Sequence, residues 1–342
     1  MKRIIPLCLA LVMTVGLLTG CGKQNEPAAS DETRLRVVTT IFPEYDWVRE
    51  ILGDKADNAE VTMLLDNGVD LHSYQPTADD IVKISECDLF IYVGGESDDW
   101  VDDALKNAAN KNRKVINLLE ALGERVKTEE AVEGMQEEEH DHDHDHEDTD
   151  EHDDAKEHDN EEEAEYDEHV WLSLKNAQTL CSAISSVLQQ IDPDNKDTYA
   201  ANASAYIKKL SALDADYQAA VNAAACKTVL FGDRFPFRYL AEDYGLRYYA
   251  AFAGCSAESE ASFETVSFLA GKVDELNLPC VLTIEGVQHK IAETIVRNTA
   301  AKNQKVLTMD SMQSTTSKDA ANGTTYLSVM ERNLSVLMEA LG

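Results

Sequence analysis

Six histidines interleaved with carboxylates form the stretch of this sequence best suited to chemistry. Between Glu137 and Glu168 the chain has twenty Asp or Glu residues, one Lys and six His. Imidazole nitrogens alternating with carboxylate oxygens are a donor set that suits zinc and its neighbours among the divalent cations. A solvated acidic spacer is the alternative interpretation, and it would be preferred for a run of Asp and Glu alone. The tract therefore predicts accessory metal binding by its histidines, which are His140, His142, His144, His146, His152 and His158.

The same stretch has almost no apolar side chains. Such a segment cannot bury enough surface to offset the entropy lost on ordering, so we expect residues 136–168 to form a disordered loop. Outside it the chain has three other histidines, His72, His169 and His289. His72 lies in a polar stretch and His169 borders the tract beside Trp171, so both are candidate metal ligands. His289 opens a predicted helix and is more typical of a surface residue.

Composition excludes one class of partner. The 342 residues carry a formal net charge of −34, and more than half of it lies in the tract. A surface of this charge attracts cations and repels nucleic acid and anionic lipid. We therefore expect no nucleic-acid partner. The length allows two domains, and a hydrophobic content of 44% supports real cores.

The N-terminus has the pattern of an export signal. Lys2 and Arg3 precede an apolar run over residues 4–18, and Leu-Thr-Gly-Cys at 18–21 resembles a bacterial lipobox. This run is short for a membrane-spanning helix and ends in small residues, which is typical of a signal peptide. The pattern predicts a signal over 1–20, lipid on Cys21, a tether over 21–34 and an extracytoplasmic protein anchored to the bacterial cell membrane. After Cys8 in the signal segment and Cys21, the five remaining cysteines show no CxxC spacing, so neither a zinc ribbon nor a complete disulfide framework follows.

Short β-branched runs alternate with helical stretches on both sides of the tract, which predicts an α/β fold with mainly parallel sheets. We expect an N-terminal lobe over 35–173, a linking helix over 174–195 and a C-terminal lobe over 196–342. Expected strands are 35–41, 61–65, 89–93, 114–118, 228–231, 247–252, 280–284 and 306–309. Expected helices are 44–52, 77–87, 98–110, 174–191, 196–225, 237–244, 262–276, 290–301 and 326–341.

Ligands of open parallel sheets bind beyond the carboxyl ends of the strands. Five candidate metal ligands fall at such ends, and one cleft between the two halves could collect all of them. They are His72, His169, Asp233, Glu285 and Asp310. For the three carboxylates the alternative is that each caps the helix that follows its strand.

Two segments resemble motifs of the zinc and manganese substrate-binding lipoproteins of bacterial ABC importers. Residues 70–77, DLHSYQPT, resemble the HxYEPT segment, and residues 167–172, DEHVWL, resemble the DPHxWL segment. The likeness covers nearly the whole chain after the lipobox. Its further motifs are Gly94-Gly95 with Trp100, residues 237–241 with Tyr244-Gly245, residues 260–262 and residues 310–312.

The resemblance implies two (β/α)4 lobes joined by a long rigid helix, with the metal held in the cleft between them. His72 and His169 match the two histidine ligands of the N-terminal lobe, and Asp310 matches the acidic position near the C-terminus. The chain departs at the third position, where Arg234 replaces His or Glu. A guanidinium has no lone pair for a metal, so Asp233 or Glu285 is expected to serve there.

The resemblance therefore predicts a non-enzymatic protein that captures Zn2+ and delivers it to an ABC permease with its ATPase. Mn2+ is the alternative metal. A zinc-dependent hydrolase and a surface adhesin are alternatives of other classes, although the sequence has no HExxH motif and no nucleophile elbow.

Overall fold

The computed structural model describes residues 34–106, 108–136, 165–256, 260–286 and 289–342. The predicted signal peptide, the predicted lipidation site Cys21 and the six tract histidines lie outside these ranges. Among the described residues, no helix is long and apolar enough to cross a membrane.

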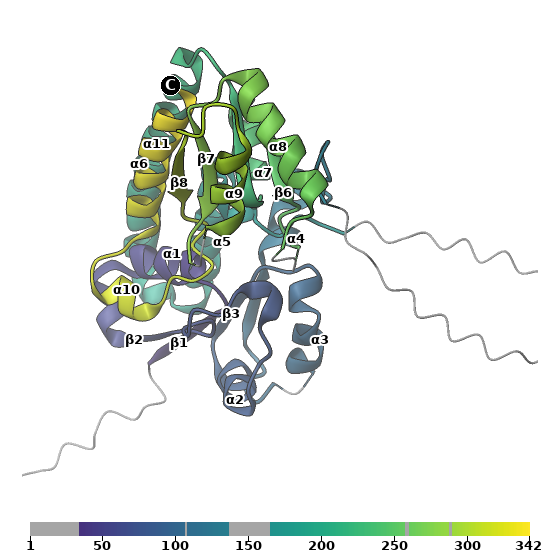
Figure 1. Ribbon diagram of the computed structural model, residues 1–342. Helices are drawn as coiled ribbons and strands as arrows, with labels where there is room; N and C mark the ends of the chain where they lie inside the picture. The colour runs from purple at the N-terminus through teal and green to yellow at the C-terminus, as the bar shows by residue number, and fades with distance from the viewer. Residues whose placement is uncertain (1–33, 107, 137–164, 257–259, 287–288) are drawn as a thin grey trace, which may run out of the picture. The chain divides into compact units, whose positions relative to one another are not determined.

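Two four-stranded parallel sheets form the framework, which confirms the predicted α/β class (Figure 1). The first has the order β2-β1-β3-β4 and the second the order β6-β5-β7-β8, so both halves share one topology. The first sheet comprises β1 (Leu35–Thr39), β2 (Ala59–Met63), β3 (Leu89–Tyr92) and β4 (Lys114–Asn117). The second comprises β5 (Thr228–Arg234), β6 (Arg247–Phe252), β7 (Cys280–Ile284) and β8 (Lys305–Met309).

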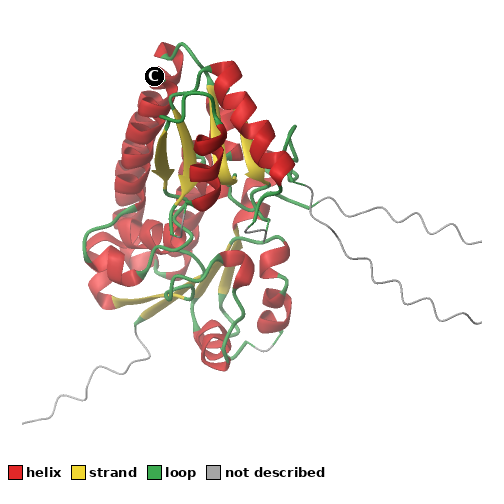
Figure 2. Cartoon of the chain, in the orientation of Figure 1, coloured by secondary structure: helices red, strands yellow, loops and turns green. Residues whose placement is uncertain are grey.

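Helices pack against both sheets, and Figure 2 shows the strands of the second sheet among them. In the first half they are α1 (Phe42–Leu52), α2 (Ala78–Glu86), α3 (Trp100–Leu105) and α4 (Leu118–Leu122). Between the sheets in sequence come α5 (Leu174–Ile191) and α6 (Lys196–Ala223). The second half has α7 (Arg238–Tyr244), α8 (Phe263–Leu276), α9 (Lys290–Asn298), α10 (Ser317–Ala321) and α11 (Tyr326–Leu341).

The long helix of the fold is α6, with 28 residues. Helix α5 has the range expected for it, Leu174–Ile191, and a short 3-10 turn that begins at Pro193 follows it in the linking segment. Helix α6 packs against α1 of the first half and against α11 of the second, and Figure 1 shows α6 and α11 side by side. Asn202 donates a hydrogen bond to Ile51 O at 3.0 Å, and Tyr217 donates one to Met330 O at 2.7 Å. One helix therefore joins both halves.

Local sequence signals set several helix ends. A capping box begins α2, since Thr77 and Asp80 exchange hydrogen bonds between side chain and backbone. The helix predicted over 98–110 is shorter, because the N–H groups of Ala109 and Asn110 both donate to Ser85 O and turn the chain back toward α2.

A buried carboxyl group begins α1. Glu44 is fully buried, and its Oε2 accepts hydrogen bonds from the N–H groups of Thr40 and Ile41 at 2.8 and 3.3 Å. Its other oxygen, Oε1, has no hydrogen-bond partner in the described structure. Burial raises the pKa of Glu44 from 4.5 to about 8, so the folded protein holds this proton more tightly than the unfolded chain.

This raised pKa predicts a stability effect that grows with pH. The Glu44 carboxyl is protonated in both states below about pH 4.5, and it destabilises the fold increasingly as the pH rises from 4.5 to about 8. Glu44→Gln removes this contribution. Over this pH range, the unfolding free energy of the variant should therefore fall less steeply with pH than that of the wild type, by up to about 1.4 kcal/mol per pH unit. Urea unfolding of metal-free protein between pH 5 and 8 measures it. Glu86→Gln, at an exposed ion pair with Arg36, is the control and should keep the wild-type slope.

Candidate metal site

His72 lies in a short 3-10 turn beyond the carboxyl end of β2. The Asp70 side chain begins this turn by accepting a hydrogen bond from the His72 N–H at 3.1 Å. The imidazole Nδ1 lies 2.8 Å from Ser97 Oγ and 3.4 Å from Glu168 Oε2. Burial, with the neighbouring His169, lowers the pKa of His72 to about 3. The ring is therefore neutral near pH 7, which is the state that binds metal.

His169 comes at the other end of the first half, just before the 3-10 turn that leads into α5, and it is fully buried. Asp167 Oδ1 accepts hydrogen bonds from the His169 backbone N–H at 2.9 Å and from its Nδ1 at 3.0 Å. A carboxylate oxygen can only accept, so the ring proton of neutral His169 sits on Nδ1. The Nε2 atom then carries a free lone pair.

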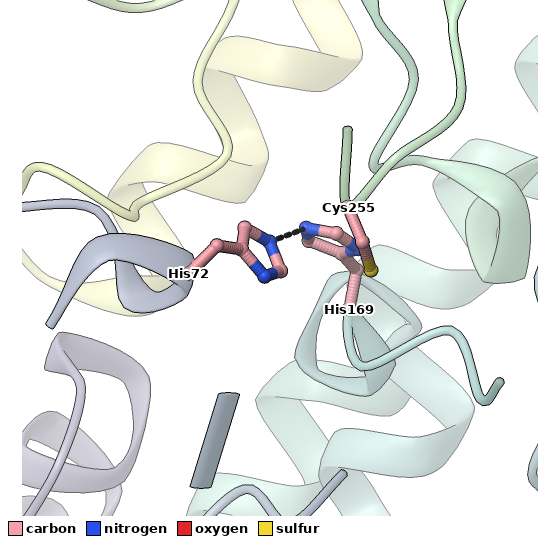
Figure 3. Close-up of side chains that lie close together, drawn as sticks. All are labelled: His72, His169 and Cys255. Carbon is pink, nitrogen blue, oxygen red and sulfur yellow. Dashed lines mark hydrogen bonds between the residues drawn. The ribbon is translucent and has the colours of Figure 1, made fainter. Parts of the chain in front are cut away.

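The two imidazoles meet through their Nε2 atoms, which are 3.3 Å apart (Figure 3). Four ligands around zinc at about 2.0–2.1 Å stand about 3.3–3.4 Å from one another, so this separation is that of two nitrogens on one tetrahedral ion. A carboxylate oxygen lies near the other nitrogen, Nδ1, of each ring. It belongs to Glu168 for His72 and to Asp167 for His169. Carboxylates in this position orient metal-binding histidines and raise their basicity.

A series of hydrogen bonds between polar side chains lies beside the site. Arg234 donates to Asp70 Oδ2 at 2.6 Å, so the residue at the departing motif position is held by a carboxylate of the first half. With the Gln313 amide oriented to donate to both Asp70 oxygens, at 3.0 and 3.1 Å, its own oxygen lies 3.3 Å from His169 Nε2, from which it accepts a hydrogen bond only when that nitrogen is protonated. This orientation is preferred because the Asp70 oxygens can only accept. Arg234 therefore fixes Asp70, and Asp70 aims the Gln313 oxygen at the histidine pair.

Cys255 is the third member of the group, and the sequence reasoning missed it. A ring nitrogen of each histidine and the Cys255 Sγ lie within 4.8 Å of one another, and Figure 3 shows the thiol beside His169. Burial, with the nearby Glu129 and Asp167 carboxylates, raises the pKa of this thiol well above its usual range. The available signal was its place in the loop after β6, at the same edge as the predicted ligands.

The three candidate carboxylates accept hydrogen bonds from neighbouring groups. Asp233 accepts from the Arg234 N–H at 2.9 Å and from Thr283 Oγ1 at 3.0 Å. Glu285 accepts from the Ser311 side chain and from the Gln313 N–H, at 2.7 and 3.0 Å. In the described part of the chain, the group of potential ligands around the two histidines contains none of these acids.

Asp310 and His289 also have other partners. Asp310 Oδ1 accepts from the Met312 N–H at 2.9 Å, and its Oδ2 lies 3.8 Å from the Arg332 guanidinium. His289 Nδ1 is 2.8 Å from Thr283 Oγ1 at the start of α9. Asp310 therefore stabilises the local turn by accepting a backbone hydrogen bond, as capping carboxylates do.

Two lobes of equal topology and two imidazoles whose Nε2 atoms lie 3.3 Å apart define a candidate metal-binding protein. Comparison with known families agrees with this class. Residues 37–340 match the family described as zinc-uptake complex component A, periplasmic. The chain belongs to this family of transport substrate-binding proteins, which are not enzymes.

Individual relatives carry zinc in their names. The chain is 31% identical to the high-affinity zinc uptake system protein ZnuA of Bacillus subtilis, over 95% of this chain and 94% of that protein. It is 30% identical to the zinc-binding lipoprotein AdcA of Streptococcus pneumoniae, over 99% of this chain. The match spans 61% of AdcA, so the chain covers about three fifths of that relative's length.

A solved structure has the same fold. The Zn(II)-bound ZnuA-like domain of Streptococcus pneumoniae AdcA aligns with a TM-score of 0.66 at 28% identity, covering 90% of this chain and 99% of that domain. The predicted two-lobed fold is therefore confirmed by comparison as well as by the sheets themselves.

The carboxylate behind His169 predicts a measurable effect. Asp167→Asn removes the charge that supports Nδ1 while keeping the size of the side chain, so metal affinity should fall by about 10- to 100-fold. Competition with a coloured chelator measures the affinity, and thermal unfolding of metal-free protein shows whether the fold is retained. Asp79→Asn, which makes the same charge change at an exposed site, is the control and should bind normally. Equal losses in both variants would assign the effect to net charge.

Proposed function

We propose that this chain captures Zn2+ outside the cytoplasmic membrane and delivers it to an ABC-type permease with its ATPase. The observation that carries the proposal is the 3.3 Å approach of His72 Nε2 to His169 Nε2, with each Nδ1 directed at oxygen atoms. Family membership supports the transport role. The lipobox-like segment supports a lipid anchor on Cys21.

Zinc is favoured over manganese by the donors that meet at the site. Imidazole ligands suit Zn2+, whereas Mn2+ prefers carboxylates, carbonyls and water. The three carboxylates that could have made the site more suitable for manganese are bonded to neighbouring groups. The names of the zinc-binding relatives agree with this preference.

Substitution of either paired histidine tests the site. His72→Ala and His169→Ala each remove a nitrogen from a preformed site, so zinc affinity should fall by at least about 100-fold, or ~2.7 kcal/mol. His289→Ala is the matched control, because that imidazole is bonded to Thr283 instead. Native mass spectrometry with zinc titration of the chain from Gly22 onward gives stoichiometry and affinity. Absence of tight zinc binding in the unsubstituted chain would overturn the proposed function.

Deletion of the acidic tract separates accessory binding from the main site. Because the paired histidines are held by folded elements, removal of residues 137–159 should change the affinity of the tight site by less than about tenfold, or ~1.4 kcal/mol. The same deletion should abolish weak additional zinc binding and slow capture at low salt, where a highly negative segment concentrates cations.

The deletion should begin after Gln136, whose N–H donates to Ala251 O at 2.9 Å and whose side chain accepts from the Ser262 N–H at 2.7 Å. Zinc titration and stopped-flow capture measure the two effects. Loss of the tight site on deletion, with both histidine variants binding normally, would place the metal in the tract instead.

A further inference from the structure

We infer that Cys255 supplies a thiolate ligand to the transported metal and thereby makes the site select zinc over manganese. This inference rests on the proposed function. It goes further by naming the anionic donor, which neither the sequence motifs nor the predicted carboxylates identify.

The backbone holds Cys255 against the histidine pair. A Cβ built on the preceding Gly254 would stand 3.1 Å from His169 Nδ1 and 3.0 Å from Phe235 O, so a glycine lets the loop pass close to the ring. The Cys255 N–H donates to Glu129 Oε1 at 2.8 Å, which ties the loop to the segment before the acidic tract. The thiol is therefore positioned by two segments of the chain.

Cys255 differs from the other described cysteines in its surroundings. Cys87, Cys181 and Cys280 are buried in the hydrophobic core, where they act as small apolar side chains. Cys255 is half-buried beside two imidazoles, and all five described cysteines are free. The location is typical of a ligand rather than of core packing or a disulfide.

The sulfur fills a place that the carboxylates leave open. Around a tetrahedral zinc ion a nitrogen and a sulfur ligand stand about 3.6 Å apart, given Zn–S of about 2.3 Å. The sulfur lies within 4.8 Å of a ring nitrogen of each histidine, so it is near enough to join the two imidazoles around one ion after a small adjustment of the site. As the metal–sulfur bond forms, the thiol proton passes to solvent, so the site gains one negative charge against the dication.

Thiolate ligation changes which metals are accepted. Soft sulfur donors bind zinc well, while Mn2+ favours oxygen ligands. Replacing the thiol by a hydroxyl should therefore weaken zinc binding much more than manganese binding. The ratio of the two affinities reports on the donor, and the absolute zinc affinity reports on the site as a whole.

Cobalt(II) is the probe, because a thiolate bound to Co2+ gives an intense near-ultraviolet charge-transfer absorption that nitrogen and oxygen ligands do not give. The chain from Gly22 onward, loaded with one Co2+, should show this absorption. Cys255→Ser should lose it and should lower the ratio of zinc to manganese affinity by at least about tenfold. Cys226→Ser, at a half-buried cysteine whose thiol lies 3.9 Å from Thr228 O, is the control and should keep both properties.

The outcomes separate the inference from the proposed function. One tightly bound Co2+ or Zn2+ without charge-transfer absorption in the unsubstituted chain would overturn the role of Cys255 and leave the capture of zinc intact. Failure of the unsubstituted chain to bind one zinc tightly would overturn the proposed function itself. The decisive spectrum comes from the unsubstituted chain, so it does not depend on whether Cys255→Ser folds.

Discussion

The close approach of two imidazole nitrogens is the constraint around which this site is built. Lone pairs on His72 Nε2 and His169 Nε2 at 3.3 Å repel each other, and a cation between them turns that repulsion into attraction. A proton on Nε2 of His169 would relieve this repulsion. Asp167 disfavours that tautomer, because its carboxylate accepts a hydrogen bond from the proton on Nδ1. The folded chain therefore holds two donors in a binding arrangement and loses little conformational entropy when the metal arrives.

The Arg234 position shows how a residue that cannot ligate still serves a metal site. Its guanidinium neutralises Asp70, which would otherwise stand beside His72 as an unpaired charge. Asp70 in turn begins the turn that carries His72 and orients the Gln313 amide. The ion pair joins residues 164 positions apart in sequence, one from each half of the fold. It therefore contributes to the closure of the two halves around the metal site.

Much of this arrangement could be predicted from local sequence. The alternating pattern predicted both sheets, Thr77 predicted the start of α2, and the rule for parallel sheets drew attention to His72, which lies in the turn after β2. The partners of Arg234 could not be predicted, because Asp70 meets it only after the two halves pack. The hydrogen bonds of Asp233 were equally hidden, since they depend on Thr283 of a neighbouring strand.

Attraction of cations and choice between cations depend on different groups of this chain. Carboxylates near the site orient rings or bond to backbone N–H groups, and they leave the group of potential ligands to nitrogen and sulfur. Their summed negative charge still attracts cations of every kind, since Coulomb attraction does not distinguish Zn2+ from Mn2+. Discrimination must then come from the donor atoms that touch the metal. Because Cys255 is the soft donor in that group, a single side chain has more influence on selectivity than the whole acidic surface.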